Sequence, residues 1–418
     1  MKFKSPFSHG IMIPWFKKQA ITHKIEPLRR GGVVRLPLPC ALSPEEAAEL
    51  FQPRRVTAGE RLWEAEGEMP FYATVTGRIL GVESVETAQG ETACLTIRFT
   101  GKTWAMPEPE ALPELPEDII EAAREAAIID ETDGEPLWKK LQALKENPVP
   151  VLVVNGVEPE PFACSAHGVL KIDGPLVMQG AKLAAEAVGI PQRVLAVQLK
   201  RKQEAAIKRR LKKETVYGVP NYYPVRQYVE EGPDAVVARI GAQACLALYR
   251  AVVYGVPAIT GVVTVSGDAV QKSRNLRVPY GVSIATLFEH VGLEDDPNYV
   301  IAGDALTGVS VTTDDVPVLP EITCVLGLID RPSPVAHTCI GCGRCARACH
   351  KHLLPYEISR RLENSHYDRL ATLCPERCDG CGNCGYVCPA GKDLTAQVLE
   401  AKEHSAAVVM KWGESDDV

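Results

Sequence analysis

Two cysteine runs near the C-terminus constrain this chain more than any other feature of its sequence. The chain reads CIGCGRCARACH from residue 339 and CDGCGNCGYVCP from residue 378, so each run has the spacing C-x2-C-x2-C-x3-C. Together the runs hold eight of the fourteen cysteines. Such dense, regular spacing indicates cysteines that share a function.

The spacing predicts two 4Fe–4S clusters, because each run can give three thiolates to one cluster and its fourth to the other. Two-residue intervals bring three sulfurs together, whereas the fourth lies about one helical turn further on. We expect cluster 1 to be held by Cys339, Cys342, Cys345 and Cys388, and cluster 2 by Cys378, Cys381, Cys384 and Cys349. Two neighbouring clusters predict one-electron transfer rather than acid–base or nucleophilic catalysis.

Zinc and disulfides are the competing interpretations of these cysteines. Structural zinc sites also use C-x2-C pairs, but they usually place two pairs far apart. Disulfides belong to exported chains, and the first residues do not resemble an export signal. His350 stands where proline commonly follows the fourth cysteine, and Cys374 is an extra thiol that we expect to be free. The isolated cysteines are expected in the core: Cys40, Cys94, Cys164, Cys245 and Cys324.

The composition excludes two classes of function. The net charge of −7 argues against a protein that mainly neutralises nucleic-acid phosphates. The most apolar stretch is interrupted by Arg239, Arg250 and Asp268, so it is too short to cross a bilayer. We therefore expect a cytoplasmic protein, peripheral at the inner face of the membrane only through partner subunits.

The pattern of strands and helices predicts a multidomain α/β chain of 418 residues. An extended segment (1–32) precedes a β-rich module (33–105), and a proline- and glutamate-rich boundary follows. Alternating strands and helices over 118–255 indicate a parallel sheet covered on both faces. A mixed β and α module (256–325) and the cysteine-rich segment (330–418) complete the chain.

Three segments ahead of the cysteines carry a family resemblance: VNGVEPEPF (154–162), VVTVSGDAV (262–270) and NLRVPYGVSI (275–284). The chain resembles the RnfC-like family, the C subunits of the Rnf ion-translocating electron transport complex, whose relatives include cobalamin reductase and the proline-reductase electron-transfer protein. The resemblance implies that the β-rich module is a barrel-sandwich, that 118–255 is Rossmann-like, that 256–325 is a β-grasp (SLBB) domain and that the last segment is a dicluster ferredoxin-like domain.

In that family the Rossmann-like domain binds FMN and takes hydride from NADH, and its glycine-rich loop brings backbone amides close to phosphate. The corresponding segment here reads AAIIDETDGEPLWKKLQ (126–142), where only Gly134 remains. Four carboxylates stand where a phosphate would lie: Asp130, Glu131, Asp133 and Glu135. We therefore expect that flavin binding has been lost. If FMN binds, the candidates are Asn155, Glu158 and Glu160, whose other interpretation is a strand-to-helix turn with carboxylate caps.

The segment KRKQEAAIKRRLKK (200–213) has eight Lys or Arg in fourteen residues. It is either a solvated helix face or a docking surface for an acidic ferredoxin or flavodoxin. Three functions stay open: an Rnf-like electron-transfer subunit, with or without FMN and NADH oxidation; a soluble reductase partner; and a non-redox binding module with structural clusters.

Overall fold

The computed structural model describes residues 10–100, 116–198, 201–219, 222–224, 237–329 and 336–413. It divides into two compact units. The scaffold unit comprises Trp15–Pro220 and Arg226–Asp330, and the cysteine-rich unit comprises Met1–Pro14, Asn221–Val225 and Arg331–Val418. Residues 107–115 of the expected proline- and glutamate-rich boundary lie outside the described residues.

A four-stranded parallel sheet forms one part of the scaffold unit, in the order β10-β9-β8-β11. Its strands are β8 (Val151–Gly156), β9 (Gln192–Val197), β10 (Val216–Gly218) and β11 (Val237–Gly241). Its helices are α3 (Pro116–Glu125), α4 (Leu137–Glu146), α5 (Ser165–Ala187), α6 (Arg201–Arg210) and α8 (Ala242–Tyr254). Near-continuous Val and Leu in β8 and β9 match a sheet buried on both faces.

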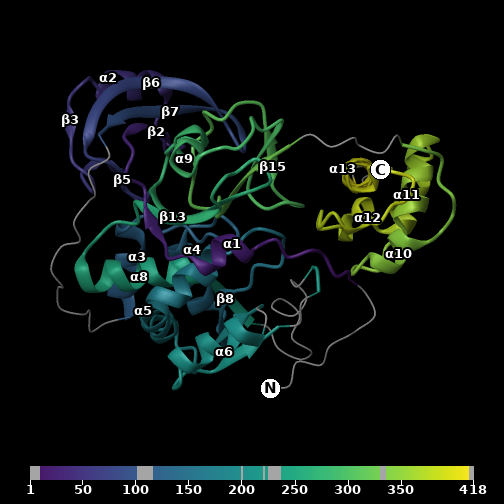
Figure 1. Ribbon diagram of the computed structural model, residues 1–418, viewed down its shortest axis with the longest axis horizontal. Helices are drawn as coiled ribbons and strands as arrows, with labels where there is room; N and C mark the ends of the chain where they lie inside the picture. Colours follow the sequence, from purple (N-terminus) through teal and green to yellow (C-terminus); the bar gives the residue numbers. More distant parts are fainter. Residues whose placement is uncertain are drawn as a thin grey trace. The chain divides into compact units, whose positions relative to one another are not determined.

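The helix α5 is longer than its sequence pattern predicts. The apolar segment from Gly180 to Ile190 indicates a helix, but α5 begins at Ser165 and includes Pro175. Glycine and proline in its first half weaken the helical signal. Packing against α8 and α3 stabilises α5, and Figure 1 shows these helices close together.

An antiparallel sheet in the order β2-β7-β6-β3 occupies the predicted β-rich region. It consists of β2 (Gly32–Pro37), β3 (Arg55–Val56), β6 (Gly77–Thr87) and β7 (Gly90–Phe99), and the pair β4 (Arg61–Trp63) and β5 (Phe71–Tyr72) lies between β3 and β6 in sequence. Helix α2 (Pro44–Leu50) lies in a region where the sequence pattern predicts strands; it is short but begins with a capping box of Ser43 and Glu46.

A mixed six-stranded sheet in the order β1-β13-β12-β16-β14-β15 completes the scaffold unit. Its strands are β1 (Glu26–Pro27), β12 (Thr260–Ser266), β13 (Arg274–Pro279), β14 (Tyr299–Ala302), β15 (Val309–Val311) and β16 (Cys324–Leu328), with helix α9 (Ile284–Val291). The expected extended N-terminal segment contributes β1 and a short helix, α1 (Lys18–Thr22). Val34 and Ile97 of the antiparallel sheet share one hydrophobic core with Val263 and Phe288.

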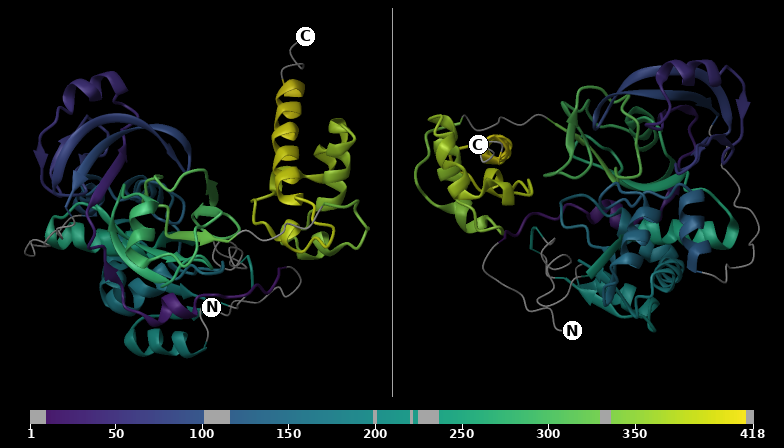
Figure 2. Two further views of the ribbon diagram at one scale, coloured as in Figure 1. Left: turned by 45° about the horizontal axis from the view of Figure 1, so that its top comes forward. Right: turned by 180° about the vertical axis from the view of Figure 1, so that it is seen from behind.

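The cysteine-rich unit is mainly helical. Its helices are α10 (Arg344–Ala348), α11 (Pro355–Glu363), η1 (Tyr367–Arg369), η2 (Ala371–Leu373), η3 (Pro375–Arg377), α12 (Asn383–Tyr386) and α13 (Leu394–Gly413). The helices α11 and α13 pack side by side (Figure 2). A backbone bridge between Ile11 and Tyr223 brings two distant parts of the sequence into this unit. Among the described residues, no helix combines the length and apolar character needed to cross a bilayer.

Candidate functional site

The eight cysteines of the two runs gather around two small cavities. One cavity is lined by Cys339, Cys342, Cys345 and Cys388, and the other by Cys349, Cys378, Cys381 and Cys384. Each cavity therefore draws three cysteines from one run and the fourth from the other. We name them the first and second cysteine sites.

The backbone reaches these positions through a matched pair of glycine turns. In the first run Gly341 and Gly343 have φ of +68° and +66°, and in the second Gly380 and Gly382 have φ of +71° and +80°. This left-handed conformation is strained for residues with a Cβ. The turns allow the chain to curl around each cavity and to begin α10 and α12.

Backbone amides at the second site point at sulfur. The amide of Gly380 donates to Sγ of Cys378 at 3.4 Å, and the amide of Leu353 donates to Sγ of Cys349 at 3.3 Å. Burial raises the pKa of Cys381 to about 12 and that of Cys384 to about 11, so without a metal these thiols stay protonated. Four converging sulfurs with amide donors fit a thiolate-held iron–sulfur cluster, whose binding would release protons.

Two residues outside the cysteine pattern hold the second site in place, and the sequence analysis missed both. The Tyr223 hydroxyl donates to the carbonyl oxygen of Cys381 at 2.6 Å. The side-chain Nδ2 of Asn383 donates to the carbonyl oxygens of Tyr223 and Ala348, each at 3.2 Å. Tyr223 lies 158 positions from Cys381 in the chain, so no local sequence signal could have identified it.

Other residues singled out from the sequence lie near these sites or apart from them. Nε2 of His350 is 2.9 Å from a carboxylate oxygen of Asp379, beside the second site. Cys374 lines neither cysteine cavity and packs on the core between α11 and α13. Four of the five isolated cysteines are buried as expected, but the expectation is wrong for Cys40, which is exposed in the segment between β2 and α2.

The flavin candidates lie at the carboxyl edge of the parallel sheet, where neighbouring strands β8 and β11 lead into α5 and α8. After β8 the chain continues to β9 and β10 on one side of β8, and β11 then returns to the other side; such a switch point in strand order is where α/β sheets bind ligands. The amides that begin α5 and α8 would be the groups able to hold a phosphate. A phosphate fits there only if these backbone amides lack hydrogen-bond acceptors within the chain.

The amides at the start of α5 are bonded to Glu158. One carboxylate oxygen accepts from the amide of Ala166 at 2.9 Å, and the other accepts from the amide of His167 at 3.1 Å. The Ser165 hydroxyl adds a third bond at 3.0 Å. Glu158 is therefore a helix cap, as the alternative interpretation of this loop proposes.

Glu131 caps α8 in the same way. Its carboxylate oxygens accept from the amides of Gln243 at 2.7 Å and Ala244 at 2.9 Å. The carboxylate lies so close to Gly241 that an added Cβ there would come within 2.3 Å of it. Burial, followed by the charge of Asp130, raises the pKa of Glu131 to about 8. Asp130 itself is buried, contacts Nζ of Lys140 at 2.6 Å and accepts from the amide of Gly241 at 3.1 Å.

The other expected flavin residues also have internal partners. The Asn155 side chain accepts from the amide of Val157 at 3.1 Å. Glu160 is buried and accepts from the amide of Leu306 and the hydroxyl of Thr307, each at 2.5 Å. Of the acidic-loop residues, Asp133 pairs with Lys140 at 2.7 Å and Glu135 is exposed.

The described residues at this edge do not fit an FMN phosphate. Carboxyl groups of the chain itself already accept from the amides at both helix starts, so a phosphate would have to displace them. His167 lies within the same edge, and burial lowers its pKa to about 4, so it supplies no compensating positive charge near neutral pH. We call the starts of α5 and α8, together with the capping residues Glu158 and Glu131, the filled flavin edge.

The basic segment is partly helical, as α6. Ile207 and Leu211 are buried in the core of the parallel-sheet region, while Lys208, Arg209, Lys212 and Lys213 are exposed. The segment therefore has a core-facing stripe and a charged outer surface.

Comparison with known proteins identifies two regions. Residues 125–243 match the Nuo51 FMN-binding domain, and residues 338–392 match the 4Fe-4S dicluster domain. The first match covers the filled flavin edge, and the second covers both cysteine runs.

Relatives align with most of the chain. It is 27% identical over 381 residues to the C subunit of the ion-translocating oxidoreductase complex of Rhodobacter capsulatus, covering 84% of this chain and 73% of the relative. It is 25% identical over 397 residues to the C subunit of the Na(+)-translocating ferredoxin:NAD(+) oxidoreductase complex of Acetobacterium woodii, covering 87% and 88%. A chain from the crystal structure of an NAD+-reducing NiFe-hydrogenase in its H2-reduced state aligns with a TM-score of 0.48 and 16% identity, covering 73% of this chain and 67% of that chain.

Proposed function

The chain is a divergent homologue of the C subunits of ion-translocating oxidoreductase complexes, and from that premise we propose that it relays single electrons between a reduced donor and a partner redox protein. The observation that carries this proposal is the gathering of eight cysteines around two cavities within a 4Fe-4S dicluster domain. When bound, a pair of 4Fe–4S clusters supplies one-electron transfer between neighbouring centres.

The ligand assignment follows the two cavities. The first site would hold cluster 1 through Cys339, Cys342, Cys345 and Cys388, and the second would hold cluster 2 through Cys349, Cys378, Cys381 and Cys384. The chain contributes the turns that place the sulfurs, the amides that donate to them and the Tyr223 and Asn383 bonds that support the second run. These contacts favour the charged thiolate clusters over free thiols.

The first site is the better candidate for electron exchange with a partner. Its Cys339 is exposed, and the neighbouring Ile340 keeps 69% of its surface accessible, whereas every cysteine of the second site is at least partly buried. Arg344 and Arg347 are exposed next to it. An apolar contact with a basic rim suits transient docking of an acidic redox protein.

The finer domain assignment is also part of this proposal. The antiparallel module within 33–105 corresponds to the barrel-sandwich domain, 118–255 to the Rossmann-like domain, 256–325 to the β-grasp SLBB domain and 330–418 to the dicluster ferredoxin-like domain. The strand orders of the three sheets and the two matched domains support this division.

We also propose partners and a location, which the named relatives support. Relatives that belong to ion-translocating complexes support association with other electron-transfer subunits, at the inner face of the membrane and through those subunits. We propose a ferredoxin or flavodoxin as a second kind of partner, which the exposed lysines of 208–213 would attract. The alternative is that the chain passes electrons from the same cysteine-rich unit to a soluble reductase. Co-purification distinguishes the two: membrane-complex subunits would support the first proposal, and a soluble reductase would support the alternative.

An FMN-containing, NADH-oxidising subunit is the second candidate function. The match of residues 125–243 to an FMN-binding domain favours it. The bonds that Glu131 and Glu158 make to the starts of α8 and α5 argue against it. We therefore propose that this region serves as a scaffold and that the electrons come from another donor.

Redox titration of the anaerobically reconstituted protein tests the electron-transfer proposal. We expect two one-electron reductions that appear as electron paramagnetic resonance signals with dithionite and disappear on reoxidation. If the clusters neither reduce nor reoxidise, they are structural, and the result would support the binding-module alternative.

A further inference from the structure

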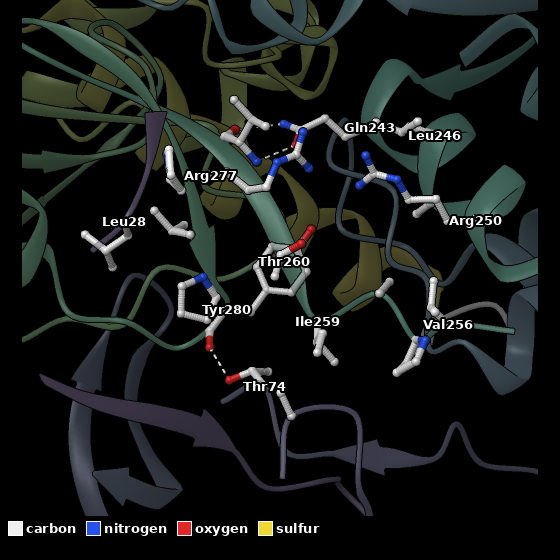
Figure 3. A pocket seen from close by; sticks show the side chains of 18 of the residues that line it. Leu28, Thr74, Gln243, Leu246, Arg250, Val256, Ile259, Thr260, Arg277 and Tyr280 are labelled. Carbon is white, nitrogen blue, oxygen red and sulfur yellow. Dashed lines mark hydrogen bonds between the residues drawn. The ribbon is translucent and has the colours of Figure 1, made fainter. Parts of the chain in front are cut away.

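A cavity of about 330 Å³ in the scaffold unit lies between helix α8 and strand β13. Its walls are mainly apolar and include Val75 and Phe99. Leu28, Leu246 and Ile259 also line it and are labelled in Figure 3. It borders Gln243 in the first turn of α8, whose side-chain amide bonds the backbone of Val262 on β12 in both directions. The volume falls at the small end of the range for organic ligands.

Two arginines extend into this cavity from opposite elements. Arg250 comes from α8, seven residues beyond Gln243, and Arg277 comes from β13 (Figure 3). The nearest acidic partner is Asp173 on α5, which also lines the cavity. One of its carboxylate oxygens lies 3.5 Å from a terminal nitrogen of Arg250 and 3.4 Å from one of Arg277.

One carboxylate does not balance two guanidinium groups. Both contacts use the same oxygen at long distances, so neither arginine has the two parallel bonds that a guanidinium and a carboxylate can form. Nε of Arg250 is buried without a hydrogen-bond partner among the described residues. Burial, and then the charge of Arg277, lower the pKa of Arg250 to about 10. The site thus has an excess positive charge and an unused donor, enclosed by apolar walls.

We propose that this cavity binds a small organic anion, with its anionic group on Arg250 and Arg277 and its apolar body against Leu28, Phe99 and Tyr280. An anion would supply the missing acceptors for the two arginines, and a buried charge-assisted bond of this kind is among the stronger polar contacts in proteins. The apolar walls would contribute through the hydrophobic effect. The cavity borders the start of α8, since Gln243 and Ala244 are among its lining residues, but it contains neither Glu131 nor Glu158 nor any of the eight cysteines, and it does not depend on the redox proposal.

Calorimetric titration of the reconstituted full-length protein tests the proposal with octanoate and 1-naphthoate, a flexible and a planar monoanion. The matched neutral probes are octanamide and 1-naphthamide. We expect one site per chain for at least one anion, and binding of its amide to be at least about tenfold weaker, which corresponds to about 1.4 kcal/mol. Lack of saturable binding of both anions, or equal affinity for anion and amide, would overturn the proposal.

Three variants distinguish the contribution of the arginine charges to binding from that of the apolar walls. Arg250→Gln and Arg277→Gln should each weaken anion binding at least about tenfold and leave binding of the amide unchanged. Asp173→Asn should have the opposite effect and strengthen anion binding, since it removes the competing carboxylate. Circular dichroism checks folding, and a misfolded variant is replaced by the other arginine variant. Anion affinity that is unaffected by both arginine changes would place the probe elsewhere and refute the site.

Discussion

The second cysteine site and the filled flavin edge both contain backbone amides that donate to side-chain atoms, with opposite results for ligand binding. In both cysteine sites glycine turns bring sulfurs together, and at the second site backbone amides donate to two of those sulfurs. At the flavin edge, α5 and α8 begin after the neighbouring strands β8 and β11, but Glu158 and Glu131 already accept from the amides of these helix starts. The first region keeps its ligand-binding groups directed at a cavity, and the second satisfies them within the chain.

The contrast shows that a region matching an FMN-binding domain can satisfy its helix-start amides with carboxyl groups of the same chain. The carboxylates at the flavin edge make the same bonds to amides that a phosphate would make, at a similar position relative to the helices. The fold then needs no ligand to satisfy its buried donors. We infer that the flavin-like region now contributes stability while the cysteine-rich unit carries the chemistry.

Removal of a cluster ligand should give the largest effect. Cys342→Ala and Cys381→Ala should each lower the iron content of the reconstituted protein from about eight to about four per chain, because each cysteine lines one cavity only. Iron analysis and electron paramagnetic resonance provide the measurement. The control Cys374→Ala should keep full iron content, since Cys374 lines neither cavity. Equal loss of both signals in each variant would mean that the sites form as one unit.

Changes at Glu131 probe the filled edge. Glu131→Ala should destabilise the protein by about 1 to 2 kcal/mol, because it leaves the amides of Gln243 and Ala244 without their acceptor. Glu135→Ala, at an exposed position in the same loop, should change stability little. Chemical denaturation followed by circular dichroism measures both. An unchanged free energy of unfolding in Glu131→Ala would show that the Glu131 cap does not stabilise the fold.

The pH dependence at Glu131 provides a separate test. Its pKa in the folded protein is about 8, above the ordinary value of 4.5, so the folded state binds more protons than the unfolded state between these values. The contribution of Glu131 to stability is therefore present below about pH 4.5 and is lost as the pH rises through about 8. Glu131→Gln should flatten the decline of unfolding free energy over this window, and Glu135→Gln should not. Parallel curves for the wild type and Glu131→Gln would contradict the raised pKa.

Tyr223→Phe should have a smaller effect on the second cysteine site. It removes the hydroxyl bond to the carbonyl of Cys381 and costs about 1 kcal/mol, or roughly fivefold in an equilibrium. In Tyr223→Phe we expect a chelator to remove iron faster from the second site than from the first. The loss of the electron paramagnetic resonance signal of the second site measures this rate. Tyr386→Phe, at a residue that is 53% exposed, is the matched control. Equal rates of iron loss from the two variants would show that the Tyr223 hydroxyl does not stabilise the second cysteine site.

Charge reversal on the basic segment should have the smallest effect. Lys212→Glu with Lys213→Glu should slow electron exchange with an acidic ferredoxin several-fold at low salt, and the difference should vanish at high salt. Lys24→Glu with Arg29→Glu reverses the same charge at other exposed positions of the scaffold unit and should leave the rate unchanged. Stopped-flow kinetics measures the rates. A rate that is equally reduced in both variants would indicate a general charge effect rather than docking.

The sequence predicts features that depend on local spacing and misses those that depend on distant contacts. The cysteine spacing predicts the ligand candidates, and the apolar runs predict strands β8 and β9. The first half of α5 is hidden by its glycines and by Pro175, because tertiary packing overrides their low helix propensity.

The filled edge shows a further limit. The loss of glycines in the segment 126–142 predicts that a phosphate does not fit, but it does not identify which carboxylates take its place. Glu131 meets Gln243 and Ala244 only through the fold, more than a hundred positions later in the chain. The same holds for Tyr223 at the second cysteine site. Such pairs require the three-dimensional arrangement of the sheet and of the loops.

Cofactor analysis after anaerobic reconstitution tests the central claim most directly. The protein is incubated with iron, sulfide and excess FMN, separated from unbound material and analysed for all three. We predict about eight irons and about eight sulfides per chain with no retained FMN. Stoichiometric FMN would contradict the filled flavin edge, and iron content well below eight would contradict the two-cluster assignment.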